Sequence, residues 1–113
     1  MSYQEVLPIT RQEAEAVFSG QNIKDICDAL VRVTYHDNDP HWLQKLCFRF
    51  CRHDSAEVRG LAVQCFGHIA RIHRTLDLQR VKAVLTELLA DTEISGRVED
   101  AMDDINMFVR NDE

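Results

Sequence analysis

The amino-acid sequence predicts an all-α protein, a short superhelical stack of about six helices that forms one domain over residues 1–113. Three observations support this fold class. Apolar residues recur at helical spacing, and no segment alternates between apolar and polar residues as a half-buried strand does. Capping and turn residues separate the apolar segments at regular intervals. The segment 54–73 is apolar around most of its circumference, so neighbouring helices must cover it on several sides.

The first half of the chain contains three of these helices. Thr10 and Glu13 have the spacing of a capping box, which opens a short helix over residues 11–18. Asn22 is placed to cap a second helix, and Asp39 is placed to cap a third, in which Pro40 takes the first helical position. The apolar faces of the second and third helices comprise Ile23, Ile26, Cys27, Leu30 and Val31, and then Trp42, Leu43, Leu46, Cys47, Phe50 and Cys51.

Three further helices follow. We expect the fourth to open at Ser55 and the fifth at Asp77, and the turn 91–96 to precede the sixth. Gly60 and Gly67 lie together on the back of the fourth helix, which indicates that another helix approaches closely there. The apolar faces comprise Val58, Leu61, Ala62, Cys65, Ile69 and Ile72, then Val81, Val84, Leu85, Leu88 and Leu89, and then Val98, Ala101, Met102, Ile105, Phe108 and Val109.

The third and fourth expected helices form one hairpin, the fifth and sixth form the next, and residues of the first hairpin match residues of the second. Asp54 matches Asp91 at a separation of 37 residues, and Ala62 matches Ala101 at a separation of 39. This period is typical of HEAT and armadillo units. The first two helices would form an earlier, degenerate unit that caps the stack.

Residues 39–108 resemble a HEAT-repeat protein, because Val58-Arg59 and Ala62 match the second-helix signature of that family. The next unit departs from the signature, since Arg97-Val98 stands where Val-Arg is expected. The small size is similar to that of bacterial HEAT-like proteins, some of which are immunity proteins for contact-dependent growth-inhibition (CDI) toxins. The resemblance implies a protein-binding function without enzymatic activity.

Charge narrows the class of partner. The formal net charge is −6, and residues 87–113 hold nine acidic residues against two basic ones. An acidic surface disfavours direct binding of nucleic acid, because phosphate contacts require positive charge. It favours a basic protein partner. The chain has no run of about 18 apolar residues and no signal peptide, so we expect a cytoplasmic protein that does not enter a membrane.

The candidate partner-binding residues fall into three groups. The first is an acidic face on the sixth helix with no Lys or Arg interleaved at the i+4 spacing, so its like charges repel one another. The second is the acidic turn before this helix, and the third is an acidic turn beside an aromatic residue, a composition suited to a binding hot spot. In that order the groups are Glu99, Asp100, Asp103 and Asp104; Asp91 and Glu93; and Asp37, Asp39 and Trp42.

Catalytic and metal sites are not predicted, and no cofactor is expected. His36, Asp37, Asp39 and His41 share a loop, but helix capping already accounts for Asp39. Cysteines at apolar helix positions are read as free core thiols rather than zinc ligands, disulfides or nucleophiles; they are Cys27, Cys47, Cys51 and Cys65, the last with His68 three residues later. The end of the fourth helix (His68, Arg71, His73 and Arg74) is read as cations at a helix C-terminus, with contact to RNA as the alternative.

The sequence therefore predicts an immunity protein that binds a basic toxin domain, such as a nuclease, and covers its active site. A nuclease must be basic to hold its polyanionic substrate, so an acidic inhibitor could take the place of the phosphates. Two alternatives remain open. One is a HEAT-type adaptor or a regulatory subunit of a cytosolic enzyme. The other is a lyase-type HEAT enzyme acting on a tetrapyrrole, for which the sequence offers no distinctive site.

Overall fold

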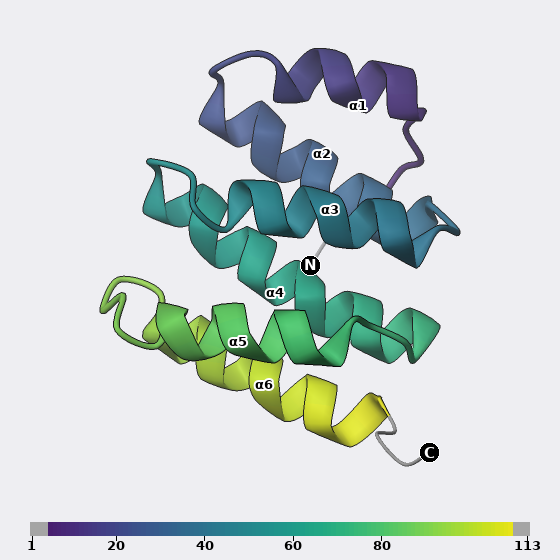
Figure 1. Cartoon of the computed structure of the whole chain (residues 1–113). Coiled ribbons are helices and arrows are strands. Elements are labelled where there is room, and N and C mark those ends of the chain that lie inside the picture. Colours follow the sequence, from purple (N-terminus) through teal and green to yellow (C-terminus); the bar gives the residue numbers. More distant parts are fainter. Residues whose placement is uncertain (1–4, 110–113) are drawn as a thin grey trace.

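The computed structural model describes residues 5–109, and this part of the chain forms six helices (Figure 1). Consecutive helices pair as antiparallel hairpins: α1 with α2, α3 with α4, and α5 with α6. The helices span Arg11–Phe18 (α1), Ile23–His36 (α2), Pro40–Phe50 (α3), Ala56–His73 (α4), Leu78–Leu88 (α5) and Ser95–Phe108 (α6). The expectation of an all-α protein with six helices is confirmed.

The caps explain where most of the helices begin. The capping box of Thr10 and Glu13 is complete at α1, and Asn22 caps α2. The Asp39 carboxylate accepts hydrogen bonds from two backbone amides at the start of α3, and Asp77 caps α5. Ser55 occupies the N-cap position of α4, but its side chain makes no capping hydrogen bond.

The helix α4 is the centre of the molecule. It packs against α2, α3 and α6, so almost all of its faces are covered. Of its residues, Val58, Ala62, Val63, Cys65, Phe66, Ile69 and Ala70 are fully buried. The prediction that this segment is enclosed by neighbours is confirmed. The second helices of the three hairpins therefore lie in one layer, in the order α2, α4, α6.

Details at the helix ends differ from the expected apolar faces. Ile72 is 42% exposed and Leu89 is 37% exposed, because each lies at the end of its helix, beyond the neighbouring helices. Leu61 is only half-buried. The helix α6 begins at Ser95, inside the segment expected to be a turn, because Ile94 is buried and its carbonyl accepts the first helical hydrogen bond from Val98.

An N-terminal segment crosses the outer face of α2 before α1 begins. The Arg32 guanidinium donates hydrogen bonds to the carbonyl oxygens of Leu7 and Pro8, at 3.0 and 2.8 Å. The His36 ring is hydrogen-bonded to the carbonyl oxygen of Val6. Two α2 side chains, one helical turn apart, thus hold three consecutive carbonyl groups and fix this segment against the helix.

Candidate functional site

The three predicted acidic groups differ in whether positively charged side chains of the same chain pair with them. Arginines from elsewhere in the chain pair with the two acidic turns, and these ion pairs bridge 26 to 34 residues of sequence. The acidic face of α6 has no such partner among the described residues. This difference decides which group offers free negative charge to another molecule.

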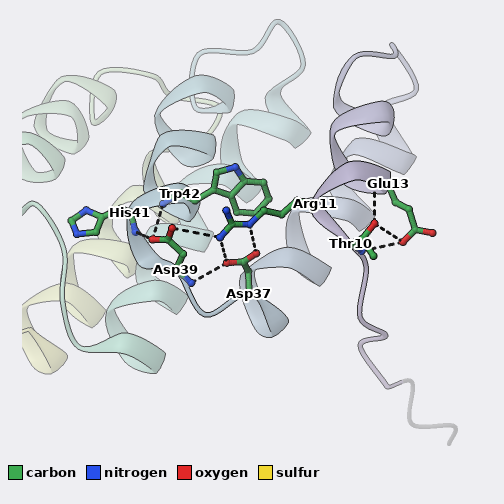
Figure 2. A network of polar contacts seen from close by, with 7 residues as sticks. All are labelled: Thr10, Arg11, Glu13, Asp37, Asp39, His41 and Trp42. Atoms are coloured by element: carbon green, nitrogen blue, oxygen red, sulfur yellow. Dashed lines mark hydrogen bonds and ion pairs between the residues drawn. The ribbon is translucent and has the colours of Figure 1, made fainter.

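The turn between α2 and α3 is built around Arg11 of α1 (Figure 2). Its Nε atom lies 2.8 Å from Asp37 Oδ2, its terminal nitrogen lies 2.8 Å from Asp37 Oδ1, and the same nitrogen is 3.5 Å from Asp39 Oδ2. The guanidinium also lies over the Trp42 ring, 4.4 Å from its centroid, in a cation–π contact. Asp37, Asp39 and Trp42 are therefore brought together around an internal cation, Arg11.

Hydrogen bonds and charge hold the carboxylates of this turn in the ionised form. The hydrogen bond from Arg11 is the main reason that the pKa of Asp37 lies below its ordinary value. The pKa of Asp39 is lowered chiefly by the backbone amide of Trp42, and also by the amide of His41. The His41 ring points away from both carboxylates (Figure 2). The carboxylate oxygens of this loop therefore serve in helix capping and in ion pairs with Arg11.

The turn between α5 and α6 has the same design. In Arg59 of α4, Nε lies 2.9 Å from Asp91 Oδ2 and Nη2 lies 2.9 Å from Glu93 Oε1. The same guanidinium also donates hydrogen bonds to the carbonyl oxygens of His53 and Asp54. One guanidinium thus joins the loop before α4 to the loop before α6. Arg59 thus brings the carboxylates of Asp91 and Glu93 together and neutralises part of their charge within the chain.

The acidic face of α6 consists of Glu99, Asp100, Asp103 and Asp104. The first three are exposed, and Asp104 is half-buried against α4. Within residues 5–109, none of the four carboxylates forms an ion pair. Four negative charges thus lie within two helical turns with no ion-pair partner in the described part of the chain, and their mutual repulsion is relieved when a cation binds.

Gly67 explains how α6 comes so close to α4. A Cβ atom added at Gly67 would lie 3.0 Å from Asp104 Oδ2 and 3.5 Å from the Cα atom of Ala101. The second α4 glycine, Gly60, is covered by the Arg97 side chain from α6. The prediction that a helix approaches the glycine face of α4 is confirmed, and the approaching helix is the acidic one.

A groove of about 410 Å³ runs along this contact between α4 and α6. Asp100, Asp103 and Asp104 line its α6 side, and Gln64 and His68 line its α4 side. Sequence reasoning did not assign Gln64 and His68 to this surface. The signal was present, because both follow Gly60 at intervals of four residues and so share its face of the helix.

A larger groove of about 730 Å³ lies between the N-terminal segment, α2 and α4. Its apolar lining includes Leu7, Cys27, Val31 and Leu61, and its charged lining includes Asp28 and Arg32. Asp28 and Arg32 form an ion pair at 3.3 Å. None of the predicted site residues lies there.

The cysteines belong to the core. All four are free, and Cys47, Cys51 and Cys65 are buried while Cys27 is half-buried. Burial raises the pKa of the Cys47 and Cys51 thiols, which disfavours the thiolate needed for a nucleophile. Among residues 5–109, no three His, Cys, Asp or Glu side chains are grouped closely enough to hold a metal ion. In the same range, no helix has the length and apolar character needed to cross a bilayer.

Comparison with known proteins shows which family the chain belongs to. A chain in the crystal structure of the CDI complex from Cupriavidus taiwanensis LMG 19424 is 31% identical to this protein, and the alignment covers 96% of each chain. The two structures superpose with a TM-score of 0.85. The present chain belongs to the same family as that CDI-complex chain. No protein-family model matches the chain, and no curated protein sequence matches it. The part of this chain left out of the alignment is shorter than any of the six helices, so the similarity extends at least partly over each of them.

Proposed function

We propose that this chain is an immunity protein that binds and neutralises a CDI toxin domain. The observation that carries the proposal is the near full-length similarity to a chain that was crystallised in a CDI complex. A protein of 113 residues with stacked helices and no assembled set of catalytic groups among its described residues is suited to binding rather than to chemistry.

The acidic face of α6 is the proposed contact surface, and the toxin domain is proposed to be basic. Among residues 5–109, no cation pairs with the four carboxylates of this α6 face, whereas Arg11 and Arg59 already pair with the acidic turns. We therefore assign the main electrostatic role to Glu99, Asp100, Asp103 and Asp104. The turn residues Asp91, Glu93, Asp37, Asp39 and Trp42 are proposed as the outer part of the interface, where charges contribute less to affinity.

A nuclease is the toxin activity that this charge fits best. A nuclease binds a polyanion and therefore carries a basic cleft, which the carboxylates of α6 could occupy in place of phosphate groups. Covering the cleft would inhibit the toxin without any chemistry on the part of the immunity protein. Opposite charges would also speed the encounter, by roughly 10- to 1,000-fold at low salt.

The fold proposal is a short HEAT-type superhelix. Three successive helical hairpins, a shared layer of second helices, and the buried positions of the matched residues Ala62 and Ala101 support it. A crystal structure would test it through the rotation that relates each hairpin to the next. Nearly equal rotations of one hand are expected, and unequal rotations would contradict the superhelix.

The decisive experiment starts from the gene immediately upstream of the one for this chain, which the proposal expects to encode the CDI toxin domain. Co-expression should rescue growth, and the purified chain should bind the toxin and block its digestion of DNA or RNA. The double substitution Asp100→Lys and Asp103→Lys reverses two charges of the α6 face and should slow association and weaken binding, most strongly at low salt. Both residues are exposed, so the fold should be retained.

A matched control separates local charge from net charge. Glu15→Lys together with Glu87→Lys gives the same change in net charge, but these exposed residues lie on α1 and α5, outside the layer of second helices. Each of them forms an ion pair at the surface, with Arg49 and Arg52 respectively, and the loss of such pairs should cost little stability, which thermal melts of the control will check. This control should associate much faster than the α6 variant. Equal kinetics for the two variants would show that only net charge matters. Full growth rescue by the α6 variant, with unchanged binding, would exclude this face from the interface.

A further inference from the structure

His68 is the one titratable group with an ordinary pKa near neutrality in the α4–α6 groove. It is half-buried on α4, and its ring packs against Tyr35 of α2, with 5.4 Å between ring centroids. Across the groove stand Asp100, Asp103 and Asp104 of α6. The imidazole is thus placed among the carboxylates proposed above to receive a cation from the toxin.

A hydrogen bond from Arg71 defines the state of this ring. The Arg71 guanidinium lies 2.7 Å from His68 Nδ1. Since a guanidinium can only donate, Nδ1 must accept with its lone pair, so the ring is neutral with its proton on Nε2. Burial lowers the pKa of His68, the positive charge of Arg71 lowers it further, and Asp104 acts in the opposite direction.

Protonation would reverse these contacts. A protonated Nδ1 cannot accept from Arg71, and two cations 2.7 Å apart repel one another. The carboxylates of α6 then become favourable partners for the ring, because they line the same groove. A cationic ring that turns toward them would neutralise part of the charge that a basic partner needs.

We propose that His68 is a pH-controlled internal competitor for the acidic groove, so that the chain binds its basic partner while His68 is neutral and releases it as His68 becomes protonated. The inference rests on the proposed function, since it concerns regulation of the same surface. By linkage, a bound partner cation and the proton on His68 must disfavour one another equally.

The groups that face His68 limit the pH range in which this competition operates. They are Tyr35 from α2, Gln64 and Arg71 from α4, and Asp100, Asp103 and Asp104 from α6. Tyrosine, arginine and aspartate ordinarily keep one charge state between about pH 5 and 6.5, whereas histidine ordinarily titrates near 6.5. Because one proton is coupled to binding, affinity should fall by up to about tenfold per pH unit below the pKa of His68.

Two substitutions at this position test the inference against the same toxin domain, with affinities measured between about pH 5 and 7.5. His68→Gln retains an acceptor for Arg71 but cannot titrate, so its affinity should stay nearly constant as pH falls. His68→Lys places a permanent cation in the groove and should bind weakly throughout. His41→Gln, at an exposed histidine outside the groove, is the control and should keep the pH dependence of the wild type.

A second measurement needs no partner. In the free chain, carbon-detected NMR should show the carboxyl carbon of Asp104 shifting with the titration of the His68 ring, and this coupled shift should vanish in His68→Gln. An Asp104 signal unaffected by the His68 titration would overturn the switch. So would a pH dependence of binding that is equal in wild type and His68→Gln, although the proposed function would then stand. A toxin domain that fails to bind at any pH would instead refute the proposed function.

Discussion

Two alanine substitutions in α4 distinguish its enclosed side from its open side. Ile69 and Leu61 have side chains of equal carbon count in the same helix, yet Ile69 is fully buried while Leu61 is half-buried beside the larger groove. Ile69→Ala should lower the free energy of unfolding by about 2–5 kcal/mol, because the transfer cost and the cavity cost both apply. Leu61→Ala should cost roughly 0.7–1.5 kcal/mol, about half the value of a fully buried leucine side chain, since solvent already reaches it and no closed cavity forms.

Urea denaturation followed by circular dichroism is the appropriate assay. A domain of this length is expected to have a free energy of unfolding of roughly 6–17 kcal/mol, so both variants should remain folded in buffer unless the wild type lies at the lower limit. With a urea dependence of about 1–3 kcal/mol per molar, the midpoint for Ile69→Ala should fall by about 0.7 M or more, and clearly further than for Leu61→Ala. Equal midpoints with equal slopes would refute the argument that one side of α4 is open.

Three other predictions follow from contacts described above. Gly67→Ala should change the free energy of unfolding by less than about 1 kcal/mol in thermal melts, because the gain in helix propensity offsets the cost of moving the Asp104 carboxylate slightly. Gly67→Leu should instead lower the free energy of unfolding by about 1–3 kcal/mol, because the larger side chain forces α6 away from α4. The lowered pKa of Asp37 stabilises the fold above its ordinary value of 3.8, and this contribution is lost as the pH falls toward the lower folded-state value. Arg11→Ala should therefore lose less stability than wild type between about pH 5 and 3, and equal losses would contradict the assignment. Elemental analysis should find no stoichiometric zinc, and chelators should leave the melting temperature unchanged; one zinc per chain would overturn the reading of the cysteines as core thiols.

Local signals account for the parts of the fold that sequence reasoning predicted. Asp39 and Pro40 define the start of α3 through capping and backbone restriction, which act within three residues and are therefore visible in the sequence. The glycines of α4 also predicted a contact between distant parts of the chain, because a missing side chain indicates that another helix lies close. They did not identify which helix that is. Exposure at Ile72 could not be predicted, since it depends on where the adjacent helices end.

The site was predictable in composition but not in electrostatics. Negative charge near α6 follows from counting residues, yet its availability depends on where the arginines reach. Arg11 and Arg59 reach acidic residues 26 to 34 positions away, and such pairings follow from the packing of hairpins rather than from local spacing. His68 was assigned to the basic end of α4 by sequence proximity, whereas in three dimensions it faces the acidic helix.

The central position of α4 has a consequence for the way the molecule opens. The α1–α2 hairpin reaches the rest of the chain mainly through α2, and the α5–α6 hairpin does so mainly through α6. We therefore expect either terminal hairpin to detach while the remaining helices stay folded, and α4 to lose its structure only when both interfaces are lost. Native-state hydrogen exchange should then be graded, with α4 amides protected up to the free energy of global unfolding and α6 amides exchanging through a smaller opening. A bound toxin that holds α6 in place would slow that smaller opening first, so exchange protection would report occupancy of the acidic face before any change in the most protected amides.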